Sequence, residues 1–278
     1  MRKRIGYFCM PLIVLLLGFL LVEIVLTGIQ TLCGIAFNMT YSEVYPILFI
    51  ANNVCYVLVF GLWYGIGIKK VKHIRKSTEK VTTPCNILGI VVAAIGTAFF
   101  IVFGMELIVQ VLPRAVMENH AEIMGNLQLG NELLMNIVIC IIAPIGEELI
   151  FRGVMLAYLR MCIKGLKKEK LLFWIVNLIQ ALAFGAFHGN VYQFIYTIVL
   201  GLLLGYMVYR ANTVLVSILI HMVYNTVLTL FMNAIGNALP KSMTVYAIVA
   251  AAGFVVMMVG VLLVKRAEEE PEKELSAA

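Results

Sequence analysis

The chain has 278 residues, of which 62% are hydrophobic and only 13% are charged, and its mean hydropathy is +0.99. These values exclude an ordinary soluble domain, because so few polar side chains could not cover its surface. The net charge of +6 comes from basic residues between apolar segments. Since these would meet anionic lipid headgroups, we expect the lipid bilayer as a partner and no nucleic acid.

Apolar segments of about 20 residues, enough to cross roughly 30 Å of hydrocarbon, recur along the chain. We predict an all-α polytopic membrane protein with about eight transmembrane helices, at residues 10–35, 45–68, 87–112, 132–163, 171–189, 191–209, 212–233 and 243–264. The fourth segment is long, so we expect a tilted or broken helix there. The first is too long for a signal peptide and lacks a small-x-small cleavage site, so we expect it to stay as an anchor.

The distribution of basic residues indicates the orientation of these helices, because Lys and Arg accumulate on the cytoplasmic side. If both termini are cytoplasmic, all of the 21 Lys and Arg residues lie in inside segments except Arg114, Lys241 and Arg152. We therefore predict a multi-pass protein of the cell membrane with both termini cytoplasmic. Arg152 falls within the fourth span and needs a separate explanation.

The interior of the fourth span contains three charged side chains, Glu147, Glu148 and Arg152, each of which costs about 2.5–3.5 kcal/mol at mid-bilayer even on lenient scales. Pro144 precedes them and weakens the helix. Glu148 and Arg152 are four residues apart, so they share a helical face in the order that favours an ion pair. Glu147 is rotated by about 100° from Glu148. This pattern predicts that one acid is paired and that Glu147 is left for chemistry, although a purely structural ion network would also explain it.

Two later spans contain polar residues at the same spacing, Phe184 with His188 in the fifth and His221 with Asn225 in the seventh. Singly, such residues fit an interfacial histidine and a hydrogen bond between helices. Together with Glu147 they supply what water-mediated peptide hydrolysis needs. A Glu and a His can position and deprotonate water, and a His and an Asn can donate hydrogen bonds to the oxyanion.

These patterns, Glu-Glu-x-x-x-Arg at 147–152, Phe-x-x-x-His at 184–188 and His-x-x-x-Asn at 221–225, resemble the motifs of the CAAX protease and bacteriocin-processing (CPBP, or Abi) family. Their order and their placement on successive apolar segments match as well. The resemblance covers roughly residues 130–233. It implies an all-helical intramembrane endopeptidase related to the type II CAAX prenyl proteases, acting on a membrane-associated peptide or protein.

Carried over by motif position, the resemblance implies that Glu147 and His188 activate water and that His221 and Asn225 stabilise the oxyanion. The remaining motif positions are implied to be supporting residues: Glu148, Arg152 and Phe184.

On this basis we divide the chain into three parts. Residues 1–130 hold the first three spans, and residues 131–233 hold spans four to seven, with the catalytic core on the fourth, fifth and seventh. Residues 234–278 hold the last span and an acidic tail that we expect to be disordered.

Two histidines and a glutamate could also be zinc ligands, because a catalytic zinc usually has three protein ligands and one open position. This alternative zinc set consists of Glu147, His188 and His221. The tight His-Glu-x-x-His spacing is absent. Asn225, one turn from His221, is a poor zinc ligand but a good oxyanion donor. We therefore predict that no cofactor is required, with a zinc-dependent protease as the alternative.

Two functions of other classes fit parts of the sequence. Glu23, Glu106 and Glu147 could line the ion path of a transporter, but the two halves show no obvious internal repeat. A non-enzymatic bacteriocin-immunity or scaffold membrane protein could keep the fold without turnover. An intact set of motifs favours the enzyme.

Overall fold

The computed structural model describes residues 2–68, 81 and 83–266, and this part of the chain forms helices and no strand. The prediction of an all-α polytopic membrane protein is confirmed. Several expectations fall outside the described residues: the basic residues at 69–80, Lys273 and the acidic tail.

Seven helical segments in the described ranges are long and apolar enough to cross a membrane. They are α1 (Arg2–Phe37), α2 (Tyr41–Trp63) continued by η1 (Tyr64–Ile68), α4 (Pro84–Ile108) continued by η2 (Val109–Val111), the segment Glu132–Ile163, α9 (Glu169–Phe187), α10 (Val191–Ala211) and α13 (Met243–Leu263). The remaining expected span is α11 (Val214–Leu230), an apolar helix of 17 residues. At 1.5 Å per residue it is only about 26 Å long, so the prediction of about eight becomes seven full-length spans and one shorter helix.

Side-chain caps fix where several of these helices begin. The side-chain oxygens of Thr83, Asn131 and Asn190 accept backbone N–H groups at 3.4, 3.0 and 2.8 Å, which satisfies donors that the first turn of a helix leaves free. Between α10 and α11, Asn212 adopts φ = 53°, a left-handed conformation that Asn tolerates. The chain reverses there, and α11 follows almost directly.

The fourth span is continuous, but its winding changes along its length. It consists of α6 (Glu132–Ile137), η3 (Val138–Ile142), α7 (Ala143–Glu148), η4 (Leu149–Leu156) and α8 (Ala157–Ile163), of which η3 and η4 are π-helical. Pro144 lies in the first turn of α7. The expected break is therefore a pair of π-helical stretches, a feature frequent at functional sites.

Close backbone contact joins α4 to α13. A Cβ atom at Gly96 would lie 2.2 Å from the backbone nitrogen of Met257, and one at Gly260 would lie 2.1 Å from that of Ala93. Small residues at such contacts let membrane helices approach closely and gain packing energy. On α1, by contrast, large apolar side chains such as Leu16, Leu20 and Ile24 are exposed, as expected of a surface that faces lipid.

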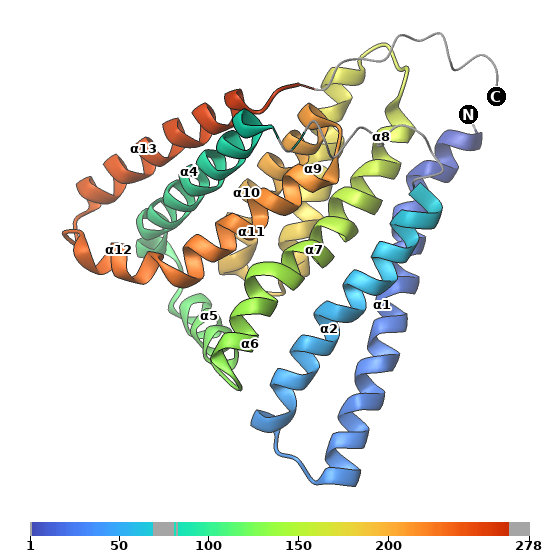
Figure 1. Cartoon of the computed structure of the whole chain (residues 1–278), viewed down its shortest axis with the longest axis vertical. Helices are drawn as coiled ribbons and strands as arrows, with labels where there is room; N and C mark the ends of the chain where they lie inside the picture. The colour runs from blue at the N-terminus through green and yellow to red at the C-terminus, as the bar shows by residue number, and fades with distance from the viewer. Residues whose placement is uncertain (1, 69–80, 82, 267–278) are drawn as a thin grey trace.

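The basic ends of several helices meet at one end of the bundle. Figure 1 shows the start of α1 and the end of α13 at the same end. Arg4 Nη1 donates to the carbonyl oxygen of Cys162 at 3.3 Å, and Arg210 Nε donates to that of Val264 at 2.7 Å. The start of α1 and the end of α13 thus lie together, as an even number of membrane crossings requires. The basic residues predict such an even number, with α11 counted as one crossing. Because α9 starts at this end, His188 at its other end lies far from it.

If the termini are cytoplasmic, cysteines at positions 189–192 are expected to react with an impermeant maleimide from outside the cell, because the rise along α9 places them about 28 Å from its start. The measurement uses single cysteines in a variant lacking the six native ones. A cysteine at Lys167, in the turn between α8 and α9, is the control and is expected to react only from the cytoplasmic side. If the cysteines at 189–192 react only from the cytoplasmic side and the cysteine at position 167 reacts from outside, the topology is the inverse of the predicted one.

Two helices were not predicted from the sequence, α5 (Arg114–Asn126) and the short α12 (Met232–Ala238). α5 is amphipathic and carries an exposed ion pair between Arg114 and Glu118. The His120 ring stacks on Tyr192 of α10 with centroids 4.1 Å apart, and burial lowers the pKa of His120 below its ordinary value. α5 is thus a helix held against the start of α10, outside the candidate spans.

Candidate active site

An ion pair between Glu148 and Arg152 lies at the centre of the site. Arg152 Nη1 is 2.8 Å from Glu148 Oε1, and both side chains are fully buried. The guanidinium also lies 4.4 Å from the centre of the Phe184 ring, a cation–π contact. The pairing predicted from their spacing is confirmed, and it explains how a charged Arg152 is accommodated within a membrane span.

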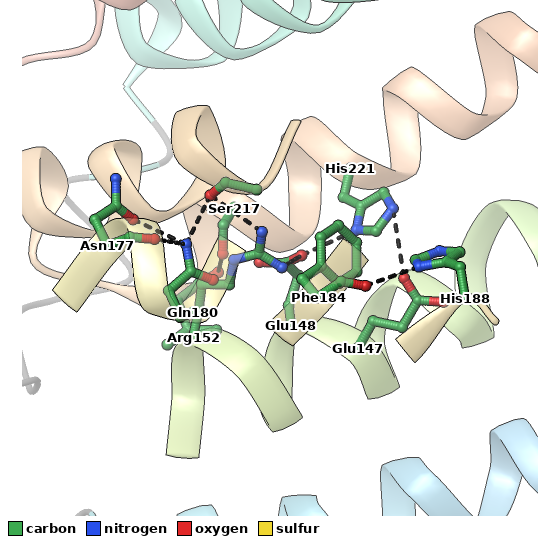
Figure 2. Close-up of polar contacts among 11 residues, drawn as sticks. Glu147, Glu148, Arg152, Asn177, Gln180, Phe184, His188, Ser217 and His221 are labelled. Carbon is green, nitrogen blue, oxygen red and sulfur yellow. Dashed lines mark hydrogen bonds and ion pairs between the residues drawn. The ribbon is translucent and has the colours of Figure 1, made fainter. Parts of the chain in front are cut away.

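His221 bridges the two neighbouring acids (Figure 2). Its Nδ1 is 2.9 Å from Glu148 Oε1, and its Nε2 is 3.8 Å from Glu147 Oε2. A carboxylate only accepts hydrogen bonds, so the contact with Glu148 places a proton on Nδ1 and leaves Nε2 facing Glu147. The spacing in the sequence pairs His221 with Asn225 and does not predict this contact with the two acids. No spacing could have revealed it, since 73 positions separate His221 from Glu148.

Glu147 and Glu148 differ in how far their side chains are exposed to solvent. The Glu148 side chain is completely buried, whereas that of Glu147 is 14% exposed. Glu147 approaches its His221 partner only to 3.8 Å, beyond hydrogen-bond distance. Glu147 is therefore the acid that a water molecule or a substrate can reach.

His188 lies directly after the last residue of α9, and local contacts fix its ring. Its Nδ1 is 2.9 Å from the carbonyl oxygen of Phe184, and the ring packs edge-on against Phe184 and Phe187. Because a carbonyl accepts, Nδ1 carries a proton and Nε2 is the free nitrogen. Figure 2 shows the His188 ring and the Glu147 carboxylate near each other. Among the described residues no direct hydrogen bond joins the two.

Asn225 makes a contact that the sequence did not predict. Its Nδ2 donates to the carbonyl oxygen of Ile139, in the π-helical stretch η3, at 2.9 Å. This bond ties α11 to the fourth span near the candidate site. One of the two amide N–H bonds remains for another acceptor.

The residues of the alternative zinc set do not form a metal-binding group as they are placed. Within the described part of the chain, no three His, Cys, Asp or Glu side chains are arranged to hold a metal ion. The Nδ1 atoms of His188 and His221 face the Phe184 carbonyl and the Glu148 carboxylate, and the His221 Nε2 faces Glu147 across 3.8 Å.

A pocket of about 500 Å³ lies between α5 and the turn that joins α9 to α10, next to His188. It is mainly apolar and is lined by Ala115, Val116, Asn119, Gly185, Ala186, Gly189, Asn190, Val191 and Phe194. The buried Asn190 side chain donates to the carbonyl oxygen of His188 at 3.3 Å. One wall of the pocket is thus formed by the turn that holds His188.

Comparison with protein families matches residues 129–227 to the model described as "Type II CAAX prenyl endopeptidase Rce1-like". Neither the curated proteins nor the solved structures contain a match. The matched residues include the three motifs and the acids, histidines and arginine of the site. Residues 129–227 are thus similar to the Rce1-like type II CAAX prenyl endopeptidases, as the resemblance to CPBP membrane proteases predicted, and they lie within an all-α polytopic membrane protein.

Proposed function

We propose that the protein is an intramembrane endopeptidase that hydrolyses a peptide bond in a membrane-associated protein or peptide. The observation that carries the proposal is the arrangement around His221, where a buried ion pair fixes one imidazole nitrogen and the other faces a partly exposed carboxylate. A site that held charges only for packing would have no need to leave Glu147 accessible.

In the proposed reaction Glu147 accepts a proton from a water molecule that His188 positions through its free Nε2. The resulting hydroxide attacks the carbonyl carbon of the substrate, and the carbonyl becomes an oxyanion. When the carbon–nitrogen bond breaks, the proton held by Glu147 passes to the leaving amine. The peptide and one water molecule thus give a free carboxyl group and a free amine, and the Glu147 carboxylate is regenerated.

The oxyanion is assigned to His221 and Asn225, as the motif positions imply. Asn225 offers the N–H bond that Ile139 does not use. His221 donates from Nε2 in its doubly protonated form, in which Nδ1 keeps its bond to Glu148 and the second proton, taken up from solvent before the reaction, is not consumed. Donors held in place before the reaction, as the Glu148 contact holds this ring, are the ones that stabilise a developing charge most effectively.

The substrate is proposed to reach the site near the turn after α9. The pocket against this turn is large enough and apolar enough for side chains of a membrane peptide. The protein reconstituted in liposomes with a library of membrane peptides is expected to cleave defined bonds, read by mass spectrometry. Absence of cleavage by folded protein across the library would favour the immunity or scaffold function.

We further predict that activity does not depend on a tightly held metal. Purified protein is expected to contain much less than one zinc per chain and to keep its activity after exhaustive chelation, because the described side chains form no three-ligand group. Metal content by mass spectrometry is measured together with the cleavage rate. About one zinc per active chain, lost with activity and restored with added metal, would establish the zinc-dependent alternative.

A further inference from the structure

Two amide side chains of α9, Asn177 and Gln180, are fully buried but have no part in the proposed reaction. Gln180 Nε2 lies 3.0 Å from the Asn177 carbonyl oxygen, 2.8 Å from Asn177 Oδ1 and 2.9 Å from the carbonyl oxygen of Gly201. Asn177 Nδ2 in turn donates to the Leu202 carbonyl at 3.0 Å. The two amides therefore connect α9 to the middle of α10.

The orientation of the Gln180 amide is determined by its surroundings. The three oxygens around Nε2 are all acceptors. If the amide were flipped, its own oxygen would face them, and the electrostatic interaction would be repulsive. Gln180 thus presents its donor to the Gly201 oxygen.

The Gly201 oxygen is shared with the candidate site. Arg152 Nη2 donates to it at 3.2 Å, while Nη1 of the same side chain donates to Glu148. These two acceptors fix the plane of a guanidinium that is fully buried. A continuous series of contacts therefore runs from Gln180 through Gly201, Arg152 and Glu148 to His221.

The packing of α9 against α10 leaves room for these amides only because of glycine. A Cβ atom at Gly205 would lie 1.9 Å from Asn177 Oδ1 and 2.8 Å from Gln180 Nε2. Gly205 and Gly201 are four residues apart and face α9, where Ala181 is 3.0 Å from a Cβ placed at Gly201. The helices thus approach closely at this point, and the amides fill the space between them.

We propose that Gln180, held by Asn177, is a positioning residue for the site. By bonding the oxygen that Arg152 also uses, it sets the direction of the guanidinium, which orients Glu148 and keeps the proton of His221 on Nδ1. The inference extends the proposed function, on which its catalytic meaning rests. A role in joining helices alone would be served by the bond from Asn177 to Leu202, with no need for a donor at the oxygen that Arg152 contacts.

The test reads the protonation of His221 directly and needs no substrate. In protein labelled with 15N-histidine, nitrogen chemical shifts report which ring nitrogen carries the proton, and a His221→Asn variant identifies the signal among the four histidines. Wild type is expected to show His221 protonated on Nδ1. Gln180→Met, an unbranched side chain without a donor, is expected to give a mixture of tautomers. Gln180→Asn, whose shorter amide cannot reach Gly201, serves if the Met variant folds poorly.

Thr197→Val is the matched control. Thr197 is buried on α10 one turn before Gly201, and its hydroxyl donates to the Gln193 carbonyl of its own helix at 2.6 Å. Its loss is expected to reduce thermal stability and to leave the His221 signal unchanged. Folded Gln180 variants that keep the wild-type His221 signal would overturn the proposal and leave Gln180 as a contact between helices.

Catalysis provides a second, separate readout. If the protein cleaves peptides, Gln180→Met is expected to lower kcat by up to about 10²-fold with little change in KM, because small misplacements of catalytic groups have effects of this size and Gln180 does not touch the substrate. A loss of kcat/KM that comes from a higher KM, with kcat unchanged, would contradict a positioning role for Gln180. The nitrogen spectra do not depend on activity. They therefore test the positioning role of Gln180 even if the protein proves not to be a protease.

Discussion

Replacement of Glu147 by Gln is expected to lower the rate of peptide cleavage by about 10²–10⁴-fold, the usual contribution of general acid–base catalysis. The amide keeps the shape of the side chain but cannot accept a proton from water. Stability is expected to change little, because Glu147 is partly exposed and the nearest atom of His221, Nε2, lies 3.8 Å from its carboxylate, beyond hydrogen-bond distance. The measurement compares initial rates of cleavage with thermal unfolding in detergent for both proteins.

The control for this experiment is Glu118→Gln on α5, which removes an exposed acid paired with Arg114. Exposed ion pairs contribute about 0–1 kcal/mol, so this variant is expected to match wild type in both measurements. Wild-type activity in Glu147→Gln would end the assignment of Glu147 as the general base.

Glu148→Gln is expected to act mainly on folding. It leaves Arg152 as a fully buried charge without its counter-ion, a change that typically costs about 3–5 kcal/mol. The Gly201 oxygen remains as an acceptor for Arg152 but cannot neutralise it. A lower midpoint of thermal unfolding and a smaller yield of folded protein are the expected observations.

A double variant separates the charge effect from the loss of a side chain. Glu148→Leu combined with Arg152→Met removes both charges, and it is expected to be more stable than Glu148→Gln because no buried charge is left unpaired. An unfolding midpoint of Glu148→Gln equal to that of wild type would show that the ion pair does not stabilise the fold.

Hydropathy predicted the helices because the membrane imposes both length and composition on them. All expected spans correspond to helices, and α11 differs only in being shorter. α5 was missed because it is not apolar; the four-residue spacing of Arg114 and Glu118 was its available signal. Within the site, the pair of Glu148 and Arg152 was predictable because it lies on one helix. The bond of His221 to Glu148 was not, since it depends on how distant helices pack.

The arginines at the basic end of the bundle join the ends of different helices. The last carbonyl groups of a helix have no partner within it. Arg210 supplies donors to the carbonyls of Leu262 and Val264 at the end of α13, and Arg4 supplies one to Cys162 near the end of α8. If the basic residues orient the spans as the positive-inside rule implies, the same residues also fasten one span to another. Neutralising Arg210 would therefore loosen the end of α13 from α10 even where orientation is preserved.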